Sequence, residues 1–245
     1  MRHFNLNHAI AIGVLVSTGV FVEVQASSTT DNGDTGQSDV VRMLDEKRVM
    51  FRDMSGSTTE AINVLRHKYG VPVSFISVAD EKPEAVQFGD EELTLRNALD
   101  EFVQTRGAYT YSLVAGRLVV HPKSEPFKKV ISAIEIRNKP RLDAMWAFVE
   151  HLKRTHVEFA NLIPPAILGN PEAPLFAEPV SALKEKATVV EHLAALLGDN
   201  PNVMFSIVDG PRSGTRLFVL SKLKSSEAKR LPKPKDRRTT EPRAD

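Results

Sequence analysis

The stretch Thr94–Gly116, TLRNALDEFVQTRGAYTYSLVAG, decides the fold because a related stretch follows it 94 residues later. Thr188–Gly210, TVVEHLAALLGDNPNVMFSIVDG, aligns with it without a gap, and most apolar positions of the two stretches coincide. After five additional residues in the second copy, Arg117-Leu118 aligns with Arg216-Leu217. Similarity at a constant offset is the signature of a repeated structural unit. The chain therefore predicts two copies of one module.

Local signals in the first copy predict its helices and strands. Ser57 and Glu60 have the spacing of a capping box, in which each residue bonds the backbone amide of the other at a helix start. Apolar residues alternate over 109–113 and again over 118–120, on either side of a turn at Ala115-Gly116, which predicts a β-hairpin. The order of predicted elements is β-α-β-β-α-β-β.

The second copy repeats this order with insertions. Thr188 and Glu191 form a second predicted capping box. Val157 and Phe159 align with strand residues of the first copy, so we expect a strand there. Trp146 falls beside the apolar stripe of a predicted helix, which favours packing in the core over a sugar-binding platform. The sequence thus predicts an α+β fold of two tandem small modules, at residues 48–124 and 130–221, with a loop insert at 162–179.

The N-terminal segment has the pattern of a secretory signal peptide at residues 1–26. Arg2 precedes an apolar run, Ala9–Val22, and Val24-Gln25-Ala26 suits signal peptidase. The run is short for a membrane span, which favours a cleaved signal over a retained anchor. Residues 27–47 are predicted as a linker after the signal. We therefore expect a periplasmic or secreted protein with no membrane span after cleavage, and no disulfide forms because the chain has no cysteine.

Charge is distributed unevenly although the net charge is only +1. The segment 222–245 carries nine Lys and Arg against four Asp and Glu, and it is predicted to be a disordered basic tail. The rest of the chain is therefore mildly acidic. A nucleic-acid-binding protein would gather its cations on the folded domain, so we predict no nucleic-acid partner.

Motifs of catalysis and of cofactor binding are absent from the sequence. It contains no nucleophile elbow, phosphate-binding loop, dinucleotide fingerprint or zinc-protease helix. Glu150-His151 and Glu191-His192 are adjacent pairs, whose side chains point apart on a helix, and His121 has no carboxylate at suggestive spacing. We predict no catalytic residue, no metal site and no cofactor, with a hydrolase kept only as a third hypothesis.

A Pro-rich apolar insert in the second copy is the strongest candidate for a contact surface. Apolar residues that prolines hold rigid lose little entropy when a partner binds. The alternative is that the insert folds back over a sheet edge or over the groove between the copies. The candidate partner contacts are Ile167, Leu168, Leu175 and Phe176.

Residues 48–122 resemble the secretin and TonB short N-terminal domain. The resemblance lies in a helix start, a glycine followed by a tyrosine-bearing strand, and a closing strand that ends in proline. The residues that carry it are Thr94, Leu95, Ala98, Leu99, Asp100, Gly107, Tyr111, Gly116, Leu118, Val120 and Pro122. It extends to the second copy through the internal repeat. These positions pack the core, so they indicate the fold more strongly than the function.

The resemblance implies a periplasmic domain that binds partners of outer-membrane secretins or TonB-dependent transducers. We therefore expect a non-enzymatic adaptor whose partner is a protein of the cell envelope, in a secretion or TonB-type signalling system. The alternative is a module that binds a ligand or a cell-wall glycan in the groove between the copies. The small number of aromatic residues, one Trp and three Tyr, argues against that alternative.

Overall fold

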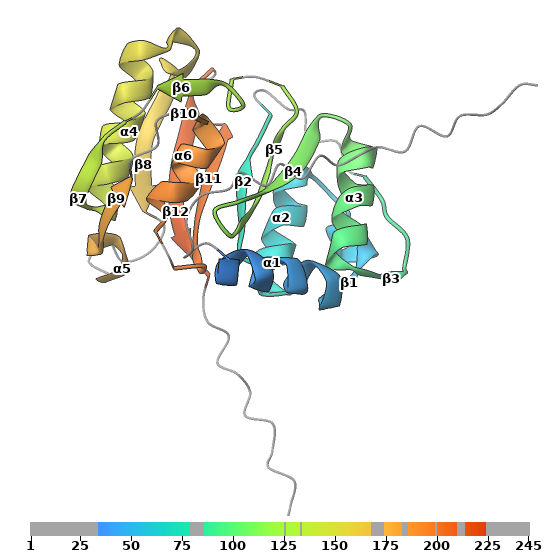
Figure 1. The fold of residues 1–245 in the computed structure, drawn as a ribbon. Coiled ribbons are helices and arrows are strands. Elements are labelled where there is room, and N and C mark those ends of the chain that lie inside the picture. Colours follow the sequence, from blue (N-terminus) through green and yellow to red (C-terminus); the bar gives the residue numbers. More distant parts are fainter. Residues whose placement is uncertain are drawn as a thin grey trace, which may run out of the picture. The chain divides into compact units, whose positions relative to one another are not determined.

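A six-stranded mixed sheet lies at the centre of the structure, in the order β4-β5-β2-β11-β12-β8 (Figure 1). The computed structural model describes residues 34–78, 86–124, 126–132, 134–167, 174–182, 186–198, 200–209 and 214–223. These residues belong to one compact unit, and their helices, mixed sheet and antiparallel ladders confirm the predicted α+β class. The predicted signal peptide and the tail beyond residue 223 lie outside the described residues. Within the described part, no helix combines the length and apolar character that a membrane span needs.

Two antiparallel hairpins and two single strands make up this sheet. The first hairpin joins β4 (Tyr109–Val114) to β5 (Arg117–Pro122), and the second joins β11 (Val203–Asp209) to β12 (Arg216–Lys222). The other strand pairings of this sheet are parallel. β2 pairs with β5 on one side and with β11 on the other, and β8 pairs with β12. The single strands are β2 (Val73–Ile76) and β8 (Leu162–Ile167).

Three two-stranded antiparallel ladders accompany the large sheet. They pair β1 (Arg48–Met50) with β3 (Glu92–Thr94), β6 (Val130–Ser132) with β10 (Lys186–Thr188), and β7 (Ile136–Pro140) with β9 (Pro179–Ala182).

Six α-helices and two short 3-10 helices occur in the described residues. They are α1 (Asp34–Glu46), η1 (Phe51–Met54), α2 (Thr58–His67), α3 (Leu95–Arg106), α4 (Arg141–Thr155), η2 (Val157–Phe159), α5 (Pro174–Ala177) and α6 (Val189–Leu196). Both predicted capping boxes are confirmed. Ser57 and Glu60 begin α2, and Thr188 and Glu191 begin α6.

The two faces of the sheet bury two different cores. Successive residues of a strand point to opposite faces, and β5 shows this alternation. Leu118 and Val120 belong to the first core, which contains residues of α1, α2 and α3. Val119, between them, belongs to the second core, which contains residues of α4 and α6. The first half of the chain, the described residues up to 124, therefore contributes helices to one face of the sheet, and the second half, those from 126 onward, contributes helices to the other.

The halves meet where β2 pairs with β11, and arginines cross this seam in both directions. Arg117 of β5 donates from Nη1 to the carbonyl of Val203 and from Nη2 to that of Asn200, each at 2.9 Å. Arg216 of β12 donates from Nη2 to the Ser77 carbonyl at 2.5 Å. The repeat aligns Arg117 with Arg216. The same position of the two copies therefore donates hydrogen bonds to the backbone of the opposite half.

Arg66 of α2 reinforces the seam from within the first half. Its Nε and Nη2 donate to the Val73 carbonyl at 2.8 and 2.6 Å, and Nη2 also reaches the Phe205 carbonyl at 3.3 Å. The side chain is buried, and burial lowers the pKa of Arg66 to about 10. It therefore stays charged at neutral pH and forms charge-assisted hydrogen bonds to backbone on both sides of the seam.

Three expectations from the sequence differ from the structure. Residues 34–46, within the predicted linker, form α1, because Val40 and Leu44 lie one turn apart and pack into the core despite the polar composition around them. The strand expected at Val157 and Phe159 is the 3-10 helix η2, and the strand that corresponds to β2 is β8. Part of the insert predicted as a loop is therefore a strand of the large sheet.

Candidate functional site

The predicted partner-contact residues lie at one edge of the large sheet. Ile167 belongs to β8 and pairs with Leu220, while Leu175 belongs to α5. Phe176 is only 4% exposed and lies in the second core, so it is not available as a surface contact. Leu168 lies outside the described residues. The strand β8, in the described part of the insert, pairs with β12 along the edge of the sheet. This agrees with the alternative in which the insert folds back over a sheet edge.

The two outer strands of the sheet have different chemistry. β8 reads LIPPAI, and adjacent residues of a strand direct their backbone groups to opposite sides, so one of its consecutive prolines, Pro164 and Pro165, removes an amide hydrogen that a further strand would need. β4 reads YTYSLV and contains neither proline nor charge. Natural sheets usually protect their edges with proline, charge or a covering segment. The sequence prediction placed 162–179 in a loop, so it predicted neither the strand β8 nor the contrast between the two edges.

The hairpin register determines which backbone groups of β4 face away from β5. A two-residue turn, Ala115-Gly116, closes the hairpin, and both residues have positive φ, as a type I′ turn requires. Val114 and Arg117 are therefore a hydrogen-bonded pair, and bonding alternates along the ladder. The amide and carbonyl of Tyr111 and Leu113 consequently point to the outer side of β4, where no strand of the described residues pairs.

The side chains of β4 hold this strand against the first half. The Tyr111 hydroxyl donates to Asp100 Oδ1 on α3 at 2.6 Å, and Tyr111 and Leu113 both pack against the first core. Burial raises the pKa of Tyr111, so its phenol remains a neutral donor. The outer edge of β4 is therefore a row of peptide groups on a well-fixed strand.

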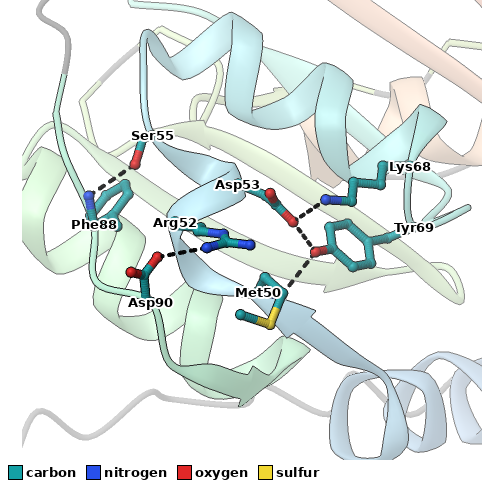
Figure 2. A network of polar contacts seen from close by, with 8 residues as sticks. All are labelled: Met50, Arg52, Asp53, Ser55, Lys68, Tyr69, Phe88 and Asp90. Carbon is teal, nitrogen blue, oxygen red and sulfur yellow. Dashed lines mark hydrogen bonds and ion pairs between the residues drawn. The ribbon is translucent and has the colours of Figure 1, made fainter.

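A polar network around Asp53 braces the start of the first half (Figure 2). The Asp53 carboxylate accepts hydrogen bonds from Lys68 and from the Tyr69 hydroxyl, whose oxygen in turn accepts the Met50 amide at 2.9 Å. The bond from Lys68 and then that from Tyr69 lower the pKa of Asp53. These bonds tie β1 and η1 to the end of α2, so we assign the network a structural role.

Ser112 and His121 form the arrangement closest to a catalytic pair. Ser112 Oγ lies 2.9 Å from His121 Nε2, and the carbonyl of Pro122 lies 2.9 Å from Nδ1. A carbonyl thus occupies the place of the carboxylate in a catalytic triad. His121 is 4% exposed, and its burial lowers its pKa. Sequence spacing did not reveal this pair because it forms across the two strands of a hairpin.

A surface pocket of about 470 Å³ lies between α4 and the chain around β7. Its walls include Trp146, which is 44% exposed and therefore not the core residue that the sequence predicted. The other lining residues combine apolar side chains with both signs of charge. They are Ile134, Glu135, Ile136, Lys139, Ala147, Glu150, His151 and Arg154.

The charges of this pocket are only partly compensated within the protein. Glu135 forms an ion pair with Arg137, and Glu150 lies 3.4 Å from Lys153. Lys139 and Arg154 form no ion pair with any described residue. Burial, with the nearby charges of His156 and Arg154, lowers the pKa of His151. The pocket therefore presents an indole ring beside two cations, Lys139 and Arg154, that pair with no carboxylate of the described residues.

No group of three or more His, Asp or Glu side chains suited to hold a metal ion occurs in the part of the chain that the structure describes. Comparison of the chain with family models, with curated proteins and with solved structures finds no match. The proposals on function therefore rest on the geometry of the edge strand β4 and of the Trp146 pocket.

Proposed function

We propose that the protein is a non-enzymatic adaptor of the cell envelope that binds an extended segment of a partner protein along β4. The outer edge of this strand is the observation that carries the proposal. Tyr111 and Leu113 direct amide and carbonyl groups outward from a strand without proline or charge. An added strand would satisfy these groups, as in other cases of β-strand addition.

The contrast with the opposite edge supports this assignment. Pro164 and Pro165 make β8 a poor template for a further strand, whereas β4 has no such protection. An unprotected edge exposes a protein to uncontrolled association unless a partner uses it. The selective protection of one edge therefore favours a specific partner at the other.

The location of the partner rests on the sequence. The predicted signal peptide at residues 1–26 directs the chain out of the cytoplasm. The resemblance of residues 48–122 to the secretin and TonB short N-terminal domain favours a partner in a secretion or TonB-type signalling system. Strand addition would supply most of the affinity through backbone bonds, and alternate side chains of the partner would supply specificity.

Photocrosslinking from β4 tests the proposal. A photoreactive amino acid replaces Thr110 in the exported protein and is activated in the cell that produces it. We expect a defined adduct with an envelope protein, which Leu113→Pro reduces by about tenfold because proline removes one outward amide. Leu113→Ala is the matched control, since it shortens the same side chain but keeps the amide, and it should retain the adduct. A photoreactive residue at Ile163 on β8 should give no such adduct.

Three outcomes would contradict the proposal. An adduct that survives Leu113→Pro would exclude strand addition, provided that this variant still unfolds cooperatively with a native circular dichroism spectrum. Proline on an edge strand with its amide position facing outward is compatible with folding. An adduct of twice the mass of the chain would show that a second copy occupies the edge. No adduct from Thr110 would show that the edge has no partner.

A further inference from the structure

Trp146 provides the starting observation for a second site, independent of the β4 edge. It is the only tryptophan of the chain, and it is 44% exposed in the pocket between α4 and β7. A tryptophan is an amphipathic residue whose flat apolar face usually contacts another group, in a core or in a binding site. Here Ile134 and Ala147 contribute further apolar surface to the same pocket.

The charges of the pocket specify the character of its ligand. The two carboxylates, Glu135 and Glu150, already have partner cations in Arg137 and Lys153. Lys139 and Arg154 are exposed and have no ion-pair partner among the described residues. The pocket is therefore complementary to a ligand that carries negative charge next to an apolar face.

The backbone next to the pocket is unsuited to a peptide strand. The pairing of β7 with β9 shifts register between Ile136 and Lys139, and Asn138 has a positive φ of 46°. Pro140, at the end of β7, has no amide hydrogen. An irregular strand of this kind is a poor template for strand addition. The carboxylates of Glu135 and Glu150 would also repel a segment made only of acidic residues.

We propose that this pocket binds an acidic glycan. The apolar face of a sugar ring stacks on the indole of Trp146, and its carboxylate pairs with Lys139 and Arg154. Sugar hydroxyls donate to Glu135 and Glu150, and His151 supplies a further polar group. Such a combination of an apolar platform with a few convergent polar groups is typical of small-ligand sites.

Tryptophan fluorescence gives a direct test because Trp146 is the only source of the signal. Soluble, uncross-linked glycan strands of alternating N-acetylglucosamine and N-acetylmuramic acid serve as the acidic probe, chosen because the chain is predicted to be exported. Chitooligosaccharides of the same length lack the carboxylates and serve as the neutral probe. We expect the acidic probe to change the emission of the full chain and to bind about tenfold more tightly than the neutral one.

Paired substitutions identify the cations that act. Lys139→Gln/Arg154→Gln keeps the fluorescent reporter and should raise the Kd for the acidic probe about tenfold, with no change in melting temperature, since both side chains are exposed. Lys123→Gln/Lys186→Gln removes two exposed lysines outside the pocket and should leave the Kd within about twofold. The Leu113→Pro variant should bind the probe normally, which separates this site from the proposed adaptor function.

The proposal is overturned by any of three results. An emission that neither probe changes, with no heat of binding in calorimetry, would show that the pocket binds no glycan. Equal affinity of the two probes would remove the role of Lys139 and Arg154. Polyglutamate that binds as tightly as the glycan strands would show that negative charge alone is recognised.

Discussion

The two halves of the sheet share one pairing scheme but end in different ways. In each half the last strand of a short antiparallel ladder runs directly into a helix. β3, paired with β1, precedes α3 in the first half, and β10, paired with β6, precedes α6 in the second. Each half also places a parallel strand beside its closing hairpin. Yet β2 of the first half lies inside the sheet, next to the second half, whereas the equivalent strand β8 lies at an edge.

This difference has consequences for both proposed sites. Because β2 lies between β5 and β11, the first half exposes its hairpin strand β4 at one end of the sheet. The second half ends in the proline-containing strand β8. The first half contains an isolated bridge between Gly56 and Val86, whereas the second half contains the β7–β9 ladder. The Trp146 pocket lies next to this ladder. One architecture thus gives an edge strand without proline or charge in one half and a surface pocket in the other.

The seam between the halves should give the largest effect on stability. Arg66→Met keeps an apolar side chain of similar length but removes the hydrogen bonds to Val73 and Phe205. We expect a loss of about 2 kcal/mol in the free energy of unfolding, measured by urea denaturation, because charge-assisted bonds to buried carbonyls are lost. Arg66→Ala should cost about 1 kcal/mol more, because it also leaves a cavity.

The control for this seam prediction is an arginine on the surface. Among the described residues Arg42 forms an ion pair only with Asp39, three residues away, and its side chain is 67% exposed, so Arg42→Met should leave stability unchanged. If Arg66→Met were as stable as the wild type, the hydrogen bonds of Arg66 to Val73 and Phe205 would make no net contribution to stability.

The two capping boxes allow a direct comparison of the halves. Ser57→Ala and Thr188→Ala each remove the side-chain oxygen that accepts the N3 amide of α2 or α6. Each should lower the free energy of unfolding by about 1 kcal/mol. Because all the described residues form one compact unit, we expect each substitution to shift the same single thermal transition.

Conservative exchanges provide the matched controls for the capping boxes. Ser57→Thr and Thr188→Ser keep the hydroxyl and should change stability by only a few tenths of a kcal/mol. Two separate transitions, with each alanine variant affecting only one of them, would show that the halves unfold independently.

The pH dependence that arises from the buried His121 of the first half should give the smallest effect. Burial, with a further contribution from Lys128, lowers the pKa of His121 below its usual value of 6.5. The unfolded chain therefore takes up this proton first as the pH falls. The free energy of unfolding decreases from about pH 6.5 down to the folded pKa, by at most about 1.4 kcal/mol per pH unit for one proton.

His121→Leu tests this pH dependence, because the repeat aligns His121 with Leu220 of the second half. Urea denaturation between pH 7 and 5 should show a shallower slope for His121→Leu, and the remaining slope contains the contribution of His151, whose pKa is also lowered. Ser112→Ala removes the hydroxyl partner but keeps the buried imidazole, so it should retain the wild-type slope. An unchanged slope in His121→Leu would assign the pH dependence to other groups.

Some features of the fold could be predicted from the sequence because they depend on neighbouring residues. The capping boxes at Ser57 and Thr188 and the hairpin turn at Ala115-Gly116 involve groups within a few residues of one another. The helix α1 was missed because polar residues around Val40 and Leu44 obscured a short apolar stripe. The strand β8 was missed because its prolines indicate a loop.

The sites could be predicted less well than the elements that carry them. Helix periodicity placed Trp146 beside the buried stripe. The spacing of apolar residues along one helix does not show how much of that helix face the neighbouring segments bury, so it could not predict the exposure of Trp146. The predicted contact Phe176 is buried because the insert returns to the second core. Ser112 and His121 approach each other only through the register of the hairpin.

The sequence by itself determined the α+β class, the internal repeat, the helix starts and the closing hairpins, since these follow from local hydrogen bonding and from the period of apolar residues. Only the tertiary structure decided that β2 pairs with β11, that β4 and β8 become the edges, and that Trp146 faces a pocket. Each of these depends on contacts between residues far apart in the chain. Such contacts are determined by the free energy of packing the whole molecule, and that free energy cannot be derived from a local sequence pattern.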